Sequence, residues 1–578
     1  MDRSDIQHYD YVIAGGGSAG CVAASRLSEN PAVRVLLIEA GRDTPPGREP
    51  AEIRSPVPAV IFHGTRYLWP KLRVAAFRGR RAQRFYEQAR VLGGGSSVNA
   101  QVGNRGIPED YEEWQRLGAE GWDWQGVLPY FRRLERDLDY AGNVAMHGAD
   151  GPVPIYRVPR SDWGELSQQL AAALEDVGLH DIGDQNGVFE DGYFSTAFTN
   201  ENNHRVTAAM AYLPAEVRRR DNLVILTDSL VTRITFSGQR ACGLAYEAKG
   251  RAFEVTAGEV ILALGALQTP AMLMRAGIGP SDILQRHGIA PRAVREGVGK
   301  NLCDHPGTHL CAVVKPQARM RAGATKAAQV ALRFTSRSPY SAVSDLYLQS
   351  GIASAWHKVG QRVSYFYLAL YKFRSRGEVT LKDADPHSMP DVNLNLLDAE
   401  GDAERLAEGF RYTAALLSTP QMSSVIDPPF ALRYSPFIRF VNQVRPLNRL
   451  VMTILGRMLD GPAWLRRLLG RYLLSNGPSL GKLLADDARL IDYLKHNMMS
   501  VFHVSGTCRM GRPDDPQAVV DAEGRVYGID GLRIVDASVM PVIPRANTNV
   551  VTFMVAEKMC DAILRGRATA TAGQPKEI

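Results

Sequence analysis

The chain has 578 residues, of which 45% are hydrophobic and 22% are charged, and its formal net charge is +7. This length exceeds what one compact core usually covers, so we expect two or three lobes. The composition excludes a disordered, collagen-like or disulfide-stapled protein and is typical of a globular body that can bury a large cofactor.

The six cysteines are scattered, without the paired spacing of a zinc site or a disulfide framework, which fits a reducing cytoplasm. The chain begins Met1-Asp2-Arg3-Ser4-Asp5, with acids where a signal peptide needs basic residues. It contains no uninterrupted apolar run of about 18 residues, the length of a membrane span. We therefore expect a cytoplasmic protein that is neither secreted nor membrane-spanning.

Residues 9–27 predict a strand, a glycine-rich turn and a helix. Residues 9–14 are a short apolar run, residues 15–20 read Gly-Gly-Gly-Ser-Ala-Gly, and residues 21–27 have helical character. The N-terminus of such a helix faces the phosphates of a bound nucleotide. A glycine loop in an unrelated α/β protein is the alternative interpretation, and the strand that follows disfavours it.

The glycines of this turn have different physical roles. Gly15 permits the tight turn, Gly17 lets the backbone approach a pyrophosphate, and Gly20 lets the helix pack closely on the strand. The next strand, residues 33–38, ends in Glu39, whose carboxylate can accept hydrogen bonds from a ribose 2′-hydroxyl. These features predict a Rossmann-like dinucleotide site but leave NAD and FAD open.

Several further stretches resemble the signatures of the glucose-methanol-choline (GMC) oxidoreductases. The resemblance runs from about residue 9 to about residue 565 and implies an FAD-dependent enzyme. It also implies a mixed α/β (α+β) fold, similar to that of p-hydroxybenzoate hydroxylase, with a Rossmann-like FAD-binding lobe and a substrate lobe built on a largely antiparallel sheet. The stretches are residues 90–99, 104–106, 111–114, 265–270, 277–280, 297–302, 375–377 and 535–538.

The family pattern divides the chain into four parts. We expect an FAD-binding lobe over residues 1–310, with a flavin-covering segment at about 80–125, and a substrate-binding lobe over residues 311–498. Residues 499–567 return to the first lobe and carry the catalytic pair. Residues 568–578 are expected to form a disordered tail.

Residues 93–97 offer backbone N–H groups and small side chains that can lie against an extended dinucleotide. Some relatives tether the flavin through a histidine next to Asn99, whereas this chain has Val98 there, so we expect FAD to bind non-covalently. The resemblance places the cofactor against Gly15, Gly17, Ser18, Gly20, Glu39, Gly94, Ser97, Asn99, Val231, Asp536, Ala537 and Asn547.

Residues 365–371 alternate aromatic and aliphatic side chains, so on a strand the odd-numbered ones share one face. Core packing and a substrate pocket are both open for that face. Within the family, the chain resembles the bacterial 5-hydroxymethylfurfural oxidase-like enzymes, which act on furan and aryl primary alcohols and on hydrated aldehydes. Where those enzymes have pocket tryptophans, this chain has Phe502 and Tyr367 or Ala369, and Ala100 completes the expected pocket.

Residues 436–475 are an insertion that is both apolar and basic, with seven arginines against a single acid, Asp460. Outside it the charge is close to neutral, which argues against a nucleic-acid partner. Apolar residues recur at helical spacing over residues 464–472 with arginines on the other side, as in an interfacial helix. Contact with the inner face of the cytoplasmic membrane, a subunit interface and a lid all remain open.

Residues 502–511 resemble the family segment that carries the catalytic histidine, His503. An imidazole with a pKa near neutrality is the side chain best suited to take the proton that alcohol oxidation releases. Asn547 is expected to hold the alcohol oxygen and stabilise its developing charge, with Asn549 as the nearby alternative. His305 also lies in a family-like stretch and is assigned no chemistry.

These observations predict FAD-dependent oxidation of an aryl, furanic or apolar aliphatic primary alcohol to the aldehyde, and onward to the acid through the hydrate. The hydride goes to flavin N5, with His503 as the base, and oxygen or a quinone is the electron acceptor. The alternatives are a membrane-associated, quinone-linked dehydrogenase of long-chain alcohols, a lyase or photodecarboxylase of the same fold, and a non-catalytic flavin-binding scaffold. No metal is expected, and the sequence leaves the oligomeric state open.

Overall fold

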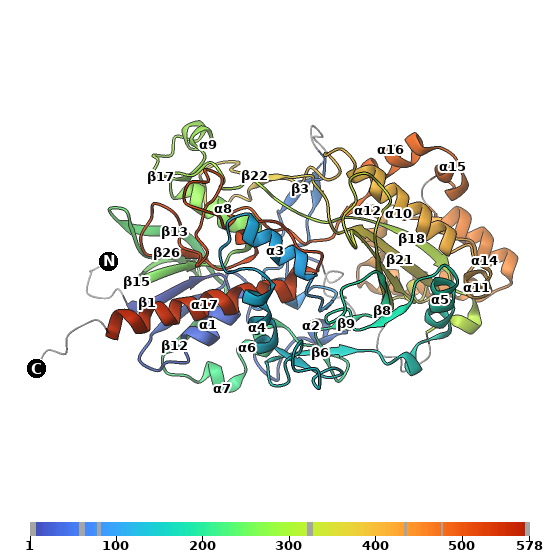
Figure 1. Ribbon diagram of the computed structural model, residues 1–578, viewed down its shortest axis with the longest axis horizontal. Coiled ribbons are helices and arrows are strands. Elements are labelled where there is room, and N and C mark those ends of the chain that lie inside the picture. Colours follow the sequence, from blue (N-terminus) through green and yellow to red (C-terminus); the bar gives the residue numbers. More distant parts are fainter. Residues whose placement is uncertain are drawn as a thin grey trace, which may run out of the picture.

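The computed structural model describes residues 7–56, 64–77, 83–320, 328–432, 436–475 and 478–572. Two lobes follow one another along the longest axis (Figure 1). The lobe on the left of that view contains the first strand and the last helix. The lobe on the right contains a second sheet and most of the helices of the C-terminal half of the chain.

The first lobe is built on a seven-stranded sheet. Its strands are β12 (Leu223–Leu226), β2 (Val35–Ile38), β1 (His8–Ala14), β15 (Arg251–Leu262), β14 (Arg240–Ala248), β13 (Ser229–Ser237) and β26 (Leu532–Ile534). β1 pairs in parallel with β2 and β15, β2 with β12, and β15 with β26. β13 and β14 extend the sheet as antiparallel strands. The arrangement is a Rossmann-like sheet with an antiparallel edge.

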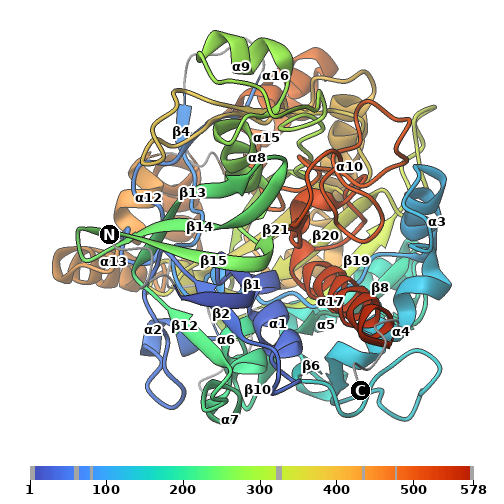
Figure 2. The ribbon, with the colours of Figure 1, turned by 90° about the vertical axis from the view of Figure 1, so that its left-hand side faces the viewer.

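Helices α1 (Ser18–Leu27) and α17 (Thr548–Ala572) lie side by side next to this sheet (Figures 1 and 2). Every residue of β2 is buried, and so is most of β1, because parallel strands covered by helices are shielded from water. The guanidinium of Arg26 in α1 donates two hydrogen bonds of 2.8 Å to the carboxylate of Glu557 in α17. This pair fixes the last helix against the first one.

The second lobe is built on an eight-stranded, largely antiparallel sheet, which confirms the predicted mixed fold class. Its strands are β24 (Phe430–Ala431), β18 (Pro306–Val313), β21 (Val363–Leu370), β20 (Leu346–Gly351), β19 (Ala328–Phe334), β8 (Gly192–Ser195), β7 (Asp181–Gly183) and β25 (Met499–Ser500). Its helices include α5 (Glu165–Asp176), α10 (Asp402–Leu416), α11 (Pro420–Val425), α15 (Leu480–Leu484) and α16 (Asp487–Asn497).

The substrate lobe takes chain from both sides of the boundary that we predicted at residue 310. β7 and β8 precede that boundary, yet β8 pairs with β19 of the second sheet. β25, from the return segment, pairs with β18. A division by residue number is therefore too simple, because strands far apart in the chain join one sheet. The predicted tail also begins later than residue 568, since α17 continues to Ala572, and residues 573–578 lie outside the described part of the chain.

Further elements lie outside the two large sheets. They are α2 (Ala51–Arg54), β3 (Arg73–Ala75), β4 (Gln83–Phe85), η3 (Gly94–Ser97), α3 (Pro108–Arg116), α4 (Trp124–Leu134), β5 (Glu135–Asp137), β6 (Val153–Arg157), η4 (Arg160–Asp162), β9 (Ala197–Phe198), β10 (Asn200–Glu201), β11 (His204–Arg205), α6 (Ala208–Tyr212), α7 (Ala215–Arg218), α8 (Gly265–Arg275), β16 (Ile278–Gly279), α9 (Ser281–Arg286), β17 (Ala293–Val294), η5 (Pro316–Ala318), η6 (Gly360–Arg362), β22 (Glu378–Thr380), β23 (Asp391–Asn393) and η8 (Ala537–Val539).

The insertion forms α12 (Pro436–Asn442), α13 (Pro446–Met458), α14 (Ala463–Leu469) and a π-helical turn η7 (Gly470–Leu474). Its inner side packs on β18 and β21, where Met452 and Leu459 share a buried cluster with Val313 and Val363. Arg466 anchors α14 through an ion pair of 3.0 Å with Asp427. Within the described residues, no helix combines the length and the apolar character that crossing a bilayer requires.

Candidate active site

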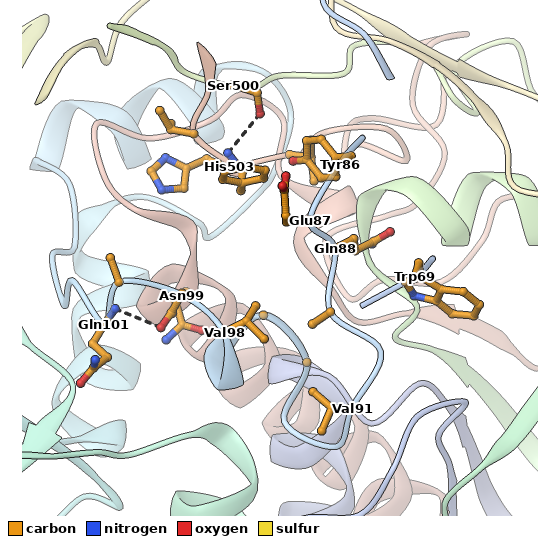
Figure 3. A pocket seen from close by; sticks show the side chains of 18 of the residues that line it. Trp69, Tyr86, Glu87, Gln88, Val91, Val98, Asn99, Gln101, Ser500 and His503 are labelled. Carbon is orange, nitrogen blue, oxygen red and sulfur yellow. Dashed lines mark hydrogen bonds between the residues drawn. The ribbon is translucent and has the colours of Figure 1, made fainter. Parts of the chain in front are cut away.

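A cavity of about 1240 Å³ extends through the molecule and is lined by both lobes and the insertion. It begins at the glycine turn after β1 and passes the segment 86–102, within the predicted flavin-covering region. It then reaches β18, β21 and the inner side of α12 and α13. Figure 3 shows His503 and Tyr86 on one side of this pocket and Asn99 and Val98 on the other. The volume and extent suit a dinucleotide together with a substrate.

In the glycine turn that lines the cavity, some glycines are required by the packing of the protein and another lets a ligand approach the backbone. Gly15 has φ of 98°, and a Cβ there would lie 2.5 Å from the carbonyl oxygen of Ala263. A Cβ on Gly20 would lie 1.9 Å from the oxygen of Gly15, so the protein's own packing requires glycine at both positions. A Cβ on Gly17 would meet no atom closer than 3.9 Å. Its bare backbone instead faces the cavity, where a pyrophosphate can approach.

Glu39 lies in the cavity wall, at the end of β2. Its carboxylate accepts hydrogen bonds from the backbone N–H of Gly16 at 2.8 Å and of Gly41 at 2.6 Å. Burial raises the pKa of Glu39 to about 7, in opposition to these two bonds, which favour the charged form. The side chain is thus held rigidly at the position predicted for ribose recognition.

The predicted residues of the glycine-serine stretch fall into two groups. Gly94 and Asn99 line the cavity, as does Val98 at the position where some relatives of the family carry a tethering histidine. Ser97 is fully buried and its hydroxyl donates to the carbonyl of Leu92 at 3.0 Å. Ser97 therefore holds the turn in shape, and our assignment of this side chain to the cofactor is corrected to a structural role.

The remaining predicted cofactor residues line the same cavity: Ser18, Val231, Asp536, Ala537 and Asn547. The Asp536 carboxylate caps η8 by accepting from the N–H of Ser538 at 2.8 Å, and it also accepts from Thr269 Oγ1 at 2.6 Å. Burial raises the pKa of Asp536. This side chain is fixed from several directions before any ligand binds.

Two features of the cavity lining match an extended flavin dinucleotide. A Cβ on Gly95 would meet no atom within 4 Å, so there is open space in the cavity beside this backbone. Asn549 lines the cavity, and its buried Nδ2 has no hydrogen-bond partner among the described residues. A buried donor of this kind needs an acceptor, which a flavin ring or a phosphate can offer. The donor set and the shape of the cradle therefore fit FAD.

His503 and Asn547 meet in this cavity. Asn547 Nδ2 lies 2.9 Å from His503 Nε2, and both side chains line the cavity. Asn549, which we considered as the alternative, instead accepts a hydrogen bond of 3.0 Å from Ser18. The backbone N–H of Asn547 donates to Asn104 at 2.8 Å, which fixes the start of α17.

The sequence analysis missed the role of His305, which holds His503 from behind. Its Nδ1 lies 2.9 Å from His503 Nδ1, and its Nε2 lies 3.1 Å from the carbonyl oxygen of Tyr371. Burial and the neighbouring His503 ring hold the pKa of His305 well below its usual range, so the ring is neutral. It therefore donates from Nε2 to Tyr371 and accepts at Nδ1 from His503.

This chain of bonds assigns the proton on His503 to Nδ1 and leaves a lone pair on Nε2. Burial lowers the pKa of His503 to about 3, so Nε2 stays unprotonated and can accept a hydrogen bond. The hydroxyl of Tyr371 donates to Asn547 Oδ1 at 3.1 Å, so the amide turns its Nδ2–H toward His503. The site thus presents one acceptor, His503 Nε2, next to one donor, Asn547 Nδ2.

Asp304 supports the segment that carries this histidine. Its carboxylate accepts from the backbone N–H of His503 at 2.9 Å and from the hydroxyl of Ser500, and burial raises the pKa of Asp304 to about 7. Phe502 adopts φ of 64°, in the left-handed region that non-glycine residues rarely occupy. Its ring centroid lies 5.1 Å from that of Tyr86.

The predicted substrate residues are partly brought together. Phe502, Tyr367 and Ala100 line the cavity. Ala369 does not belong with them, because it is fully buried in a core cluster with Tyr347 and Tyr371. On the face of β21 that Tyr367 and Ala369 share, Tyr367 therefore lines the pocket and Ala369 lies in the core. The sequence did not identify Tyr86, Tyr365, His309 and Trp356 as lining residues, although the alternating pattern of residues 365–371 includes one of them.

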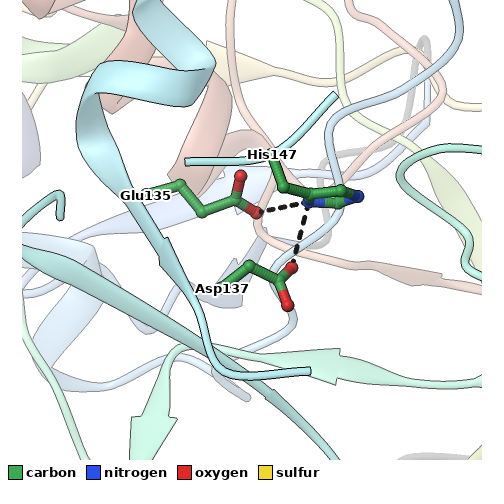
Figure 4. A group of neighbouring side chains, drawn as sticks. All are labelled: Glu135, Asp137 and His147. Carbon is green, nitrogen blue, oxygen red and sulfur yellow. Dashed lines mark hydrogen bonds and ion pairs between the residues drawn. The ribbon is translucent and has the colours of Figure 1, made fainter. Parts of the chain in front are cut away.

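Glu135, Asp137 and His147 form a buried cluster whose atoms lie close enough to hold a metal ion (Figure 4). Arg105 already pairs with Glu135, and Arg157 lies 2.9 Å from Asp137. Although burial disfavours a charged ring, hydrogen bonds to Asp137, Asp184 and Glu135 raise the pKa of His147 to about 10. Cationic side chains therefore compensate these carboxylates, and we interpret the cluster as a structural ion-pair network.

Comparisons with known proteins confirm the family resemblance. The N-terminal model of the family described as GMC oxidoreductase matches residues 9–307, and the C-terminal model matches residues 374–556. The 5-(hydroxymethyl)furfural oxidase of Methylovorus sp. (strain MP688) is 44% identical over 96% of this chain and 98% of that protein. Mitochondrial choline dehydrogenase of Homo sapiens is 33% identical over 96% and 89%.

The fold agrees with a solved structure of the same kind. Pyridoxine 4-oxidase from Mesorbium loti matches with a TM-score of 0.79 and 26% identity, over 96% of this chain and 99% of that one. The family models, the curated relatives and the fold lead to one assignment. This chain belongs to the GMC oxidoreductase family and is a flavoprotein enzyme of its alcohol oxidase or dehydrogenase type.

Proposed function

We propose that the chain oxidises a primary alcohol with an apolar body to the aldehyde, and that His503 Nε2 accepts the hydroxyl proton. The observation that supports this proposal is the chain of hydrogen bonds that places the proton of His503 on Nδ1 and leaves its Nε2, next to Asn547 in the cavity wall, as an acceptor. A neutral, oriented imidazole beside an amide donor is the arrangement that deprotonation of an alcohol requires.

Asn547 positions the substrate oxygen. Asn547 Nδ2 lies 2.9 Å from His503 Nε2, so a bound alcohol would replace this direct contact. Its oxygen would then receive a hydrogen bond from Asn547 Nδ2, while its own proton points to His503 Nε2. As that proton leaves, the amide donor stabilises the negative charge that develops on oxygen. His503 is buried and Asn547 is half-buried, and charge interactions are stronger at such positions than in open water.

FAD, when bound along the cavity, supplies the hydride acceptor. The glycine turn, Glu39, Asp536 and the donor Nδ2 of Asn549 would hold it. We propose that it is held non-covalently, because Val98 offers no nucleophile at the tethering position. Precipitation with acid should then release yellow flavin into the supernatant, whereas a covalent adduct would stay with the pellet.

The pocket wall supports the class of substrate. Phe502, Tyr367 and Tyr365 present aromatic surface near His503, which suits furanic and aryl alcohols. The oxidase relative is named for a furanic substrate, which agrees with this class. A hydrated aldehyde presents the same C–H and O–H pair as an alcohol, so the same residues can carry the product onward to the acid.

A second candidate function is the dehydrogenation of long-chain alcohols with a quinone as acceptor. The observation that favours it is the length of the cavity, which continues past the aromatic wall. There it meets apolar side chains of the insertion, Phe437, Ile438, Val441 and Leu455. Oxygen is the acceptor under the first proposal, and a quinone under this one.

An anaerobic flavin-reduction screen tests both candidates. Furfuryl, benzyl and long-chain alcohols are each mixed with the enzyme under nitrogen, and bleaching of the flavin absorbance is followed. Oxygen or a soluble quinone is then admitted to measure reoxidation. His503→Ala should slow bleaching by about a thousand-fold, within the range expected for general base catalysis. A chain that releases flavin on acid treatment but is bleached by none of these alcohols would instead be a lyase or a photodecarboxylase.

A further inference from the structure

The largest exposed apolar side chains of the described residues gather on the insertion. Leu447, Leu450 and Ile454 of α13 are 66%, 59% and 53% exposed, and Trp464 of α14 is 67% exposed. Tyr472 of the π-helical turn is 70% exposed. Figure 2 shows α13 at the edge of the molecule. Exposed apolar surface of this size marks an interaction site.

The sequence of α13 places apolar side chains on both its inner and its outer face. Asn448, Met452 and Gly456 repeat every four residues and face the protein interior. Five outward positions are apolar, Leu447, Leu450, Val451, Ile454 and Met458, and arginines stand beside them. A helix at a water-facing surface carries polar residues there. The outer face of α13 is therefore suited to an apolar environment.

Arginines surround this apolar face. Arg445, Arg449, Arg457 and Arg471 are exposed, and none of them forms an ion pair with an acid among the described residues. Arg439 and Arg466, on the inner side, do have acidic partners. An uncompensated cationic rim around apolar side chains is complementary to a surface that is anionic outside and apolar inside.

We propose that the outer face of α12–α14 docks on an anionic phospholipid bilayer, with the apolar side chains at the level of the acyl chains and the arginines at the headgroups. Contact between two copies through this face would bring the same arginines together, because a two-fold interface repeats each residue on both sides. Like charges at such close range oppose that contact. The lipid surface provides the opposite charge.

Docking in this orientation would place the cavity at the bilayer. Phe437 lines the cavity and is also 65% exposed, so the cavity approaches the molecular surface beside α12. Apolar alcohols that dissolve in the bilayer would enter there. This consequence rests on the proposed function, whereas the docking itself does not.

Vesicle flotation tests the docking with the intact holoenzyme. The protein is mixed with vesicles of phosphatidylcholine alone, or of phosphatidylcholine and phosphatidylglycerol, and centrifuged through a density gradient. Recovery with the anionic vesicles should exceed recovery with neutral ones by at least about ten-fold at low salt. Recovery that is equal on both, or absent on both, would overturn the proposal.

Matched variants locate the contact. The triple change Leu450→Ser, Ile454→Ser and Trp464→Ser should lower anionic-vesicle binding by at least about ten-fold, because it removes buried apolar contact. The control triple Val144→Ser, Val177→Ser and Val294→Ser changes exposed apolar residues elsewhere and should bind as the unchanged protein does. If both triples bind equally, the insertion is not the docking face.

A charge-matched pair examines the arginine rim. Arg445→Gln, Arg449→Gln and Arg457→Gln should weaken binding by about five-fold for each charge removed. Arg233→Gln, Arg286→Gln and Arg525→Gln remove the same charge from other exposed positions and should have a much smaller effect.

Unchanged flavin content and an unchanged rate with benzyl alcohol would show that each variant is folded. A proposed alcohol activity that fails in all proteins would leave the flotation result intact, so the two hypotheses are separable. Light scattering gives one more decisive outcome: a dimer that the apolar triple dissociates would assign this face to a second copy of the chain and overturn the lipid proposal.

Discussion

Replacement of Tyr371 by phenylalanine removes one hydroxyl from the network that orients the catalytic pair. The hydroxyl donates to Asn547 Oδ1 at 3.1 Å and so determines which end of the amide faces His503. The ring should remain in place, because it stacks on Tyr347 at 4.7 Å and on His305 at 4.4 Å. The change therefore removes the hydroxyl's bonds to the Asn547 amide and to the Asn104 side chain and leaves the ring in place.

The free-energy cost of Tyr371→Phe follows from the hydrogen bond that is lost. A neutral hydrogen bond contributes about 1 kcal/mol net, and an acceptor left buried without a donor adds to that cost, for a total of about 1–2 kcal/mol. If this free energy is lost from the transition state, the rate of flavin reduction should fall by a factor of about 5 to 30. Substrate binding should change less, because the amide donor acts on the charge that develops during the reaction.

Anaerobic stopped-flow reduction with benzyl alcohol measures the rate and the apparent dissociation constant separately. Tyr347→Phe is the matched control, because Tyr347 lies in the same aromatic stack and its buried hydroxyl has no hydrogen-bond partner among the described residues. The control should reduce at nearly the unchanged rate. If both variants slow to the same extent, stacking rather than amide orientation governs the rate, and the assignment of Tyr371 is wrong.

Three further predictions concern His305, His147 and Gly15. His305→Phe keeps a ring beside Tyr371 but leaves His503 Nδ1–H without an acceptor, so kcat with benzyl alcohol should fall by at least about ten-fold while flavin content is retained. The pKa of His147 is raised to about 10, above an unfolded value of about 6.5, so its contribution to stability is complete below pH about 6.5 and is lost as the pH rises through about 10. This contribution is on the order of 5 kcal/mol, so the melting temperature should drop between pH 6.5 and pH 10 by more in the unchanged protein than in His147→Asn; equal drops would contradict it. Gly15→Ala places a Cβ 2.5 Å from a backbone oxygen at φ of 98°, so the purified variant should contain less than about half the flavin of the unchanged protein, as measured by absorbance.

The glycine turn could be predicted from sequence because its constraints are local. Gly15, Gly17 and Gly20 lie within six positions, and the backbone geometry of one turn explains the need for each. The pairing of His503 with Asn547 was predicted through family resemblance, since no local pattern joins residues 44 positions apart. The choice of Asn547 over Asn549 depended on helix register, which the start of α17 determines.

Other features could not be read from the sequence because they arise from contacts between distant strands. His305 and His503 are 198 positions apart, and their rings meet only because β25 adds to the edge of β18. Ala369 belongs to the same face of β21 as Tyr367, yet the neighbouring strands decide where pocket ends and core begins. An alternating pattern gives the face of a strand but not the identity of what covers it.

The catalytic pair depends on contact between the two lobes. His305 directly precedes β18, Tyr371 directly follows β21, and His503 follows β25 of the same sheet in the substrate lobe. Asn547 directly precedes α17 of the first lobe and is fixed by Asn104. The contact between His503 and Asn547 therefore joins the two lobes, whereas the proton position on His503 is set within the substrate lobe. A substitution that loosens the contact between the lobes should slow proton transfer even when every residue touching the substrate is unchanged. The rate would then fall before flavin binding does, because the glycine turn and Glu39 lie wholly within the first lobe.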